Sequence, residues 1–204
     1  CEAAARDRDA LRQSLGLEPG RPVILYASKM TSRKRSLDLL DDYIKLAPNR
    51  HEPHPYLLFV GDGELRPLLE QRARETGWDS IRFLGFKNQT ELPAFFDLCD
   101  VFVLPSFDEP WGLVVNEVMN AGRAVIVSDQ VGCGPDLVRH RENGWVFRAG
   151  DVEGLSAGLR FVLENPEHTR ALGDRSREII ANWGFEQDVQ GLKQALSTIM
   201  QGTE

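Results

Sequence analysis

Short hydrophobic runs alternate along the chain with longer amphipathic segments. Five runs are typical of strands and cover residues 23–27, 56–60, 81–84, 101–104 and 124–127. A strand that is buried on both faces of a parallel sheet is apolar along nearly its whole length, as VILYA and YLLFV are. Helical patterns begin near Ser36, Glu64, Thr90 and Leu113, each after one of the first four runs. This alternation predicts β-α units around a parallel sheet.

After residue 127 the pattern changes to one short strand followed by helices. A glycine-rich loop covers 131–135, and Asn143-Gly144 predicts a turn into a strand that ends near Phe147. Asp151 is the expected N-cap of a helix to about Glu164, Pro166 opens a second helix, and a third follows Trp183. We therefore expect one domain, with an N-terminal helix and connection over 1–21, a core over 22–150 and stacked C-terminal helices over 151–204.

Composition narrows the class of protein. The net charge of −7 argues against broad nucleic-acid binding. Three cysteines without CxxC spacing predict neither a disulfide framework nor a zinc site and favour a reducing, cytoplasmic setting. The longest apolar run is far shorter than the roughly 20 residues of a membrane span. Because the sequence opens with Cys1 and not methionine, we expect it to be part of a longer protein.

Positive charge gathers directly after the first predicted strand. The segment Lys29 to Arg35 carries four cations in seven positions, just before a predicted helix. Ligands of open α/β sheets bind at the carboxyl ends of the strands, and helix N-termini offer free N–H donors to anions. The segment is either an anion site or a solvated basic loop, and composition alone leaves both interpretations open.

The segment after residues 101–104 carries two carboxylates. Glu109 lies in the predicted loop and Glu117 one turn into the next helix, so both are expected to overhang one crevice. A carboxylate accepts paired hydrogen bonds from a sugar diol, while the free N–H groups of Gly112, Leu113 and Val114 suit an anion. The alternative is that these acidic residues only complement the helix dipole.

Two of the aromatic residues in these loops are candidates for ligand contact. Gly85, Phe86 and Lys87 follow the third strand and could offer backbone groups and an aromatic edge to a base. Trp111 either stacks on a ligand or covers the start of the helix, and the sequence does not choose between these two roles.

Together these segments resemble the donor-binding C-terminal domain of retaining glycosyltransferases of the GT-B fold, family 4, also called glycosyl transferases group 1. The most specific match is the Glu-x7-Glu pattern of Glu109 and Glu117. Further matches are Val60-Gly61-Asp62-Gly63, Phe83-Leu84-Gly85, Leu104-Pro105-Ser106 and Asn143-Gly144. The resemblance extends from about residue 23 to residue 185. It implies an α/β fold, a Rossmann-like parallel sheet flanked by helices that forms the C-terminal half of a GT-B fold.

The resemblance also implies a nucleotide-diphospho-sugar donor, UDP- or GDP-linked, with roles for individual residues. Lys29 and Lys34 match the basic pair on the diphosphate, although family members usually carry Gly-Arg where Ser28-Lys29 stand here. Glu117 matches the residue that holds the ribose, and Glu109 the one near the donor sugar. The implied catalytic residues are Lys29, Lys34 and Glu109. The implied nucleotide-sugar site comprises Ser28, Lys29, Lys34, Gly61, Gly85, Phe86, Lys87, Glu109, Trp111, Gly112, Leu113, Val114 and Glu117.

The expected reaction is retaining transfer of a hexose without a metal or cofactor. Lysines and helix amides supply the positive charge that the leaving phosphate needs, and the Asp7-Arg8-Asp9 triplet lies in a predicted helix whose two aspartates diverge. The acceptor, a glycan, lipid or small molecule, would bind a missing N-terminal domain, so the isolated domain is expected to be inactive. We expect a protein of the cytoplasm or of the cytoplasmic membrane face. A non-catalytic nucleotide-sugar-binding module and a GT-B nucleotide-sugar epimerase remain alternatives.

Overall fold

A six-stranded parallel sheet forms the centre of the computed structural model, which describes residues 2–46 and 54–201. The strand order is β3-β2-β1-β4-β5-β6. The strands are β1 (Val23–Ala27), β2 (Tyr56–Val60), β3 (Ile81–Phe83), β4 (Val101–Leu104), β5 (Ala124–Ser128) and β6 (Gly144–Phe147). The predicted parallel sheet is confirmed. Three strands have the predicted bounds, β3 is one residue shorter than predicted, and β5 extends one residue further.

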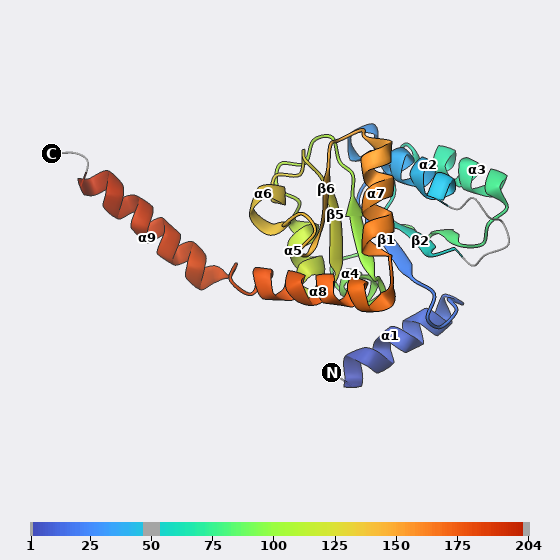
Figure 1. Cartoon of the computed structure of the whole chain (residues 1–204), viewed down its shortest axis with the longest axis horizontal. Coiled ribbons are helices and arrows are strands. Elements are labelled where there is room, and N and C mark those ends of the chain that lie inside the picture. The colour runs from blue at the N-terminus through green and yellow to red at the C-terminus, as the bar shows by residue number, and fades with distance from the viewer. Residues whose placement is uncertain (1, 47–53, 202–204) are drawn as a thin grey trace.

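Helices connect the strands and cover both faces of the sheet (Figure 1). They are α1 (Glu2–Ser14), the short 3₁₀ helix η1 (Ser32–Lys34), α2 (Ser36–Leu46), α3 (Arg66–Thr76), α4 (Leu92–Leu98), α5 (Leu113–Asn120), α6 (Gly134–Leu137), α7 (Val152–Val162), α8 (Pro166–Ile180) and α9 (Phe185–Gln201). The Asp151 carboxylate accepts a hydrogen bond from the Gly154 N–H at 2.9 Å, which confirms the predicted N-cap of α7. Pro166 opens α8 as predicted.

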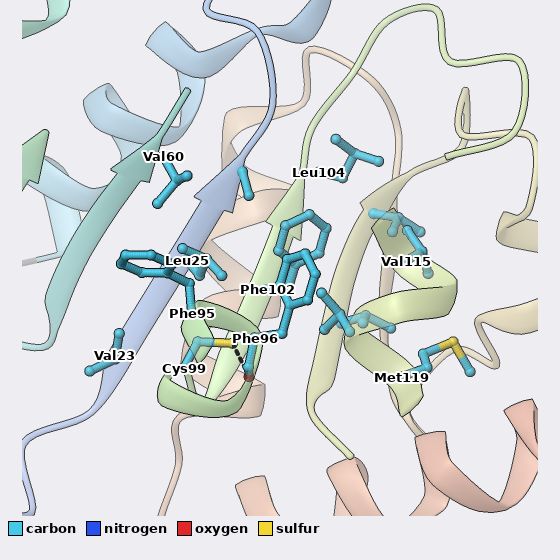
Figure 2. Close-up of a cluster of buried hydrophobic side chains, with 14 of the residues drawn as sticks. Val23, Leu25, Val60, Phe95, Phe96, Cys99, Phe102, Leu104, Val115 and Met119 are labelled. Carbon is cyan, nitrogen blue, oxygen red and sulfur yellow. Dashed lines mark hydrogen bonds between the residues drawn. The ribbon is translucent and has the colours of Figure 1, made fainter. Parts of the chain in front are cut away.

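Two hydrophobic clusters, one on each side of the sheet, form the core. On one side Leu25 and Phe102 of the sheet pack with Phe95 and Phe96 of α4 and Met119 of α5 (Figure 2). On the other side the alternate strand residues, such as Tyr26, Phe59 and Val103, pack against α2, α3 and α7. Because every residue of β1, β2, β4 and β5 is buried, the sheet is a rigid platform for the loops at its carboxyl edge.

The last helix departs from the expected stack. Whereas α7 and α8 lie against the sheet, α9 projects away from the body of the molecule (Figure 1). Its described apolar side chains Val189, Leu192, Leu196 and Ile199 are exposed. Within residues 2–46 and 54–201, none of the helices has the length and apolar character that crossing a membrane requires.

Candidate functional site

A cavity of about 600 Å³ opens at the carboxyl edge of the sheet, between the loops that follow β1, β2 and β3. It is lined by Ala27, Ser28, Lys29, Val60, Gly61, Asp62, Gly63, Phe86, Lys87 and Leu92. The structure therefore brings together five of the predicted site residues, namely Ser28, Lys29, Gly61, Phe86 and Lys87. Gly85 joins them through its carbonyl, which accepts a hydrogen bond from the Gly61 N–H at 2.8 Å.

Two glycines let the loops after β1 and β2 approach this closely. A Cβ atom on Gly61 would lie 2.2 Å from the Ser28 carbonyl oxygen, and one on Gly63 would lie 2.5 Å from the Met30 carbonyl oxygen. Both glycines also have positive φ, 125° and 156°. The Met30 N–H donates to the Asp62 carbonyl at 2.9 Å. The floor of the cavity is thus two backbones in direct contact.

The cavity walls offer a free cation and an exposed ring. Within the described residues neither the ammonium nor the N–H of Lys29 has a hydrogen-bond partner, and the side chain is exposed. Phe86 is 75% exposed at the mouth. Lys87 is engaged instead, 3.5 Å from the Glu91 carboxylate and over the ring of Phe95. A ligand anion would therefore meet Lys29 before any other lysine of this wall.

Next to this cavity, the loops after β1 and β4 are tied to each other. Lys34 and Glu109 form an ion pair in which both side chains are mostly buried. The Phe107 N–H donates to the Arg33 carbonyl at 2.7 Å, and Arg33 pairs with Asp108 at 3.2 Å. Two of the three predicted catalytic residues, which lie 75 positions apart in sequence, are in direct contact.

The backbone of Glu109 is held by the glycine-rich loop after β5. The Glu109 N–H donates to the Gln130 carbonyl at 3.2 Å, and the Gly132 N–H donates to the Glu109 carbonyl at 2.9 Å. A Cβ atom on Gly132 would lie 2.0 Å from the Pro110 carbonyl oxygen. Glycine at this position permits a strand-like bridge between Glu109 and Val131, so the carboxylate stands on a fixed backbone.

The N-terminus of α5 opens beside Glu109. Gly112 precedes the helix with φ 94°, a left-handed conformation that favours glycine. Within the described part of the chain the N–H groups of Leu113 and Val114 have no acceptor, whereas the Val115 N–H donates to the Gly112 carbonyl at 2.8 Å. These free donors and the helix dipole make this end of α5 favourable for an anion.

Trp111 and Cys133, near the start of α5, are engaged by contacts within the protein. The Trp111 indole donates to the Asn116 side chain at 3.1 Å, and its ring centroid lies 6.2 Å from that of Trp183. Cys133 is buried, and desolvation raises the pKa of its thiol to about 12. A thiol that stays protonated is a poor nucleophile.

Glu117 lies in a second hollow of about 300 Å³ between α4 and α5. Leu92 lines both hollows, while Glu109 lines neither. The two carboxylates therefore do not share either hollow, contrary to the expectation that both overhang one crevice. Glu109 lies in the loop before α5, which begins at Leu113. Glu117 lies one turn into the helix and shares its hollow with residues of α4. Desolvation by the surrounding walls raises the pKa of Glu117 above its ordinary value.

Sequence reasoning missed some residues of this region. Leu92 lines the cavity, although the sequence predicts only a helix at this position. Tyr26 is fully buried in β1 and donates a hydrogen bond to the Lys29 carbonyl at 2.7 Å. Asp62 lines the cavity and pairs with Arg66 at 3.0 Å. The Gly63 N–H, and secondly Arg66, lower the pKa of Asp62. An apolar strand gives no signal for a tyrosine hydroxyl, whereas the Gly-Asp-Gly turn does mark Asp62.

No three His, Cys, Asp or Glu side chains within residues 2–46 and 54–201 are grouped to hold a metal ion. Asp7 and Asp9 lie on α1, where the intervening Arg8 pairs with Asp100 at 2.8 Å.

Comparison with known proteins assigns the family. The family model for glycosyl transferases group 1 matches residues 7–179, and the chain belongs to this family. It is 32% identical over 164 residues to sulfoquinovosyl transferase SQD2 of Arabidopsis thaliana, covering 79% of this chain and 30% of that protein. It is 27% identical over 176 residues to N-acetyl-alpha-D-glucosaminyl L-malate synthase of Bacillus anthracis, covering 86% and 45%. The chain thus spans less than half the length of these relatives.

Solved structures share the fold. Sucrose-phosphate synthase from Thermosynechococcus elongatus is 26% identical with a TM-score of 0.77, covering 96% of this chain and 49% of that one. Anabaena Alr3699/HepE, in complex with UDP-glucose, is 25% identical with a TM-score of 0.77, covering 95% and 53%. The predicted Rossmann-like fold, that of the C-terminal domain of GT-B glycosyltransferases, is confirmed.

Proposed function

We propose that this chain is the donor-binding domain of a retaining hexosyltransferase that uses a UDP- or GDP-linked sugar. The observation that carries the proposal is the set of anion-binding groups at one edge of the sheet. Lys29 lines a cavity large enough for a nucleotide, and the Lys34–Glu109 pair and the open N-terminus of α5 belong to loops at the same carboxyl edge of the sheet. The UDP-glucose complex of Alr3699/HepE, a protein of the same fold, supports a nucleotide-sugar ligand.

In this proposal the diphosphate lies between Lys29, Lys34 and the amides of Leu113 and Val114. Cleavage of the sugar–phosphate bond places negative charge on the departing diphosphate, and fixed cations and N–H donors stabilise that charge best in a preorganised site. Lys34 begins in contact with Glu109. A diphosphate that enters the site takes over the ammonium of Lys34, and the carboxylate of Glu109 becomes available to the hydroxyls of the donor sugar.

The remaining groups divide between the base and the ribose. Phe86 and the backbone around Gly85 border the cavity mouth and would take the base, while Glu117 would accept hydrogen bonds from the ribose hydroxyls. The lysines and amides supply positive charge, so the proposed transfer needs no metal. An N-terminal domain outside this chain would hold the acceptor. In the longer protein, the product anomer and the activity in chelator test retention and metal independence.

Calorimetry and thermal unfolding with UDP, GDP and ADP test the donor site in this chain. We expect UDP or GDP to raise the midpoint of unfolding and Lys34→Ala to weaken that nucleotide at least tenfold, because a hydrogen bond to a charged group contributes about 1.5–3 kcal/mol. Lys193→Ala on the projecting helix α9 removes one exposed lysine charge away from the cavity and is expected to bind normally. Absence of binding by all three nucleotides, or unchanged affinity in Lys34→Ala, would contradict the proposal.

A further inference from the structure

Three aromatic rings form a row across the strands whose loops line the cavity. Tyr26 of β1 is in register with Phe59 of β2, and Phe59 with Phe83 of β3. The ring centroids of Tyr26 and Phe59 are 5.4 Å apart, and those of Phe59 and Phe83 are 4.9 Å apart and nearly parallel. Such in-register pairs stabilise neighbouring strands and restrict each ring to one position. The row therefore fixes where the Tyr26 hydroxyl lies.

That hydroxyl is a polar group at the end of a fully buried side chain, and it acts on the loop above it. It donates a hydrogen bond to the Lys29 carbonyl at 2.7 Å. Desolvation raises the pKa of Tyr26, so the hydroxyl remains a donor at every physiological pH. With this carbonyl held toward the core, its partial negative charge is kept away from the cavity, while the Lys29 ammonium remains exposed.

The same short loop is also held by the last residue of β2 and by the turn that follows it. The Ser28 N–H donates to the Val60 carbonyl at 3.2 Å and the Met30 N–H to the Asp62 carbonyl at 2.9 Å. Between these two anchors, within the described residues, the Lys29 N–H has no acceptor. The Lys29–Met30 peptide is thus held by its N–H through Asp62 and by its carbonyl, which accepts from the Thr31 N–H at 3.1 Å within the loop and from the Tyr26 hydroxyl. Among these contacts the Tyr26 hydroxyl is the one that ties the carbonyl to the strand core.

We propose that Tyr26 is a positioning residue that presets the 28–30 loop to receive the diphosphate of the donor. This inference rests on the proposed function, because it assigns the phosphate end of the ligand to this loop. Preorganisation lowers the entropic cost of binding, since the loop need not be ordered by the ligand. Tyr26 touches no ligand atom in this scheme, so its loss should weaken recognition of phosphate and leave recognition of the base intact.

Tyr26→Phe tests the proposal, since it keeps the ring row and removes only the hydroxyl. The probes are UDP or GDP, whichever the wild type binds more tightly, and the matching nucleoside, measured by calorimetry and ligand-detected NMR. We expect affinity for the diphosphate to fall roughly three- to tenfold, the range that loss of one hydrogen bond covers. Affinity for the nucleoside is expected to stay the same.

Tyr43→Phe is the matched control. Tyr43 is equally buried, and its hydroxyl donates to Ser80 and contacts Pro55 away from the cavity. Both variants remove one buried hydroxyl and should lower the unfolding midpoint, but only Tyr26→Phe should affect the diphosphate. Phe59→Leu, which loosens the ring row and keeps the hydroxyl, is expected to give a smaller loss in the same direction and serves if Tyr26→Phe does not fold.

The outcomes separate this inference from the proposed function. If the wild type binds the diphosphate and Lys34→Ala weakens it, but Tyr26→Phe binds normally, the inference is overturned and the proposed function stands. An equal loss for nucleoside and diphosphate would show a general structural role and also overturn the inference. If the wild type binds neither, the proposed function itself fails.

Discussion

Asp42 is a carboxyl group buried between two helices, and it makes the stability of this domain depend on pH in an unusual direction. The side chain on α2 is fully buried. One carboxylate oxygen accepts a hydrogen bond from the Ser156 hydroxyl of α7, and the other has no partner among the described residues. Desolvation outweighs the hydrogen bond from Ser156 and the charge of Arg160, and it raises the pKa of Asp42 from 3.8 to about 6.

The direction in which stability changes with pH follows from the linkage between protonation and folding. Because the folded state holds this proton more tightly than the unfolded state, the contribution to stability is fully present below pH 4 and is lost as the pH rises through 6. A difference of about 2 pKa units corresponds to roughly 3 kcal/mol of unfolding free energy. Most carboxylates that are paired in a folded protein act in the opposite direction, so the wild-type curve alone mixes both contributions.

Asp42→Asn isolates the contribution of this group. The amide has nearly the same size, is always neutral and can still accept the hydrogen bond from Ser156. We expect the variant to match the wild type near pH 4 and to be more stable by roughly 2–3 kcal/mol at pH 8. Urea unfolding followed by tryptophan fluorescence at both pH values measures this difference. A difference between variant and wild type that does not change with pH, or that favours the wild type at pH 8, would refute the reasoning.

Two further predictions concern the cavity and the hollow between α4 and α5. Gly61→Ala should destabilise the domain by roughly 2–3 kcal/mol, because a Cβ atom would lie 2.2 Å from the Ser28 carbonyl oxygen. Gly77→Ala, with positive φ but no atom within 4 Å, should cost only about 1 kcal/mol in the same thermal unfolding experiment; equal losses would argue against the close approach as the cause. Glu117→Ala should weaken the nucleotide by about 1–3 kcal/mol in calorimetry, while Asn120→Ala in the same hollow should not, and unchanged affinity in Glu117→Ala would remove its assignment to the ribose.

The sheet could be predicted from sequence because burial on both faces leaves a continuous apolar run. Helix starts were less predictable. The helix expected near Thr90 begins at Leu92, because the Asn88 side chain accepts hydrogen bonds from the N–H groups of Thr90 and Glu91 and holds a turn there. The helix expected near Glu64 begins at Arg66, because the Leu65 N–H donates to the Met30 carbonyl at 3.0 Å.

The candidate site was predictable as a set of loops but not as a set of contacts. The rule that ligands bind at the carboxyl ends of strands located Lys29, Gly61 and Phe86 correctly at one cavity. Which cation pairs with Glu109 depends on how two loops 75 residues apart meet, and no local pattern encodes that. The role of the Tyr26 hydroxyl could not be predicted from sequence for a different reason. The ring of tyrosine fits an apolar strand as well as that of phenylalanine does, so the pattern gives no signal for the hydroxyl.

The pairing between β1 and β4 is short, and the anion-binding groups lie at the carboxyl end of these two strands. Along this boundary only Ile24 with Val101 and Leu25 with Phe102 are in register, whereas β1 and β2 pair along their whole length. The Lys34–Glu109 pair joins the loops on the two sides. A molecule bound there would contact loops from both halves of the domain. Its binding would therefore also stabilise the sheet against separation of these two halves.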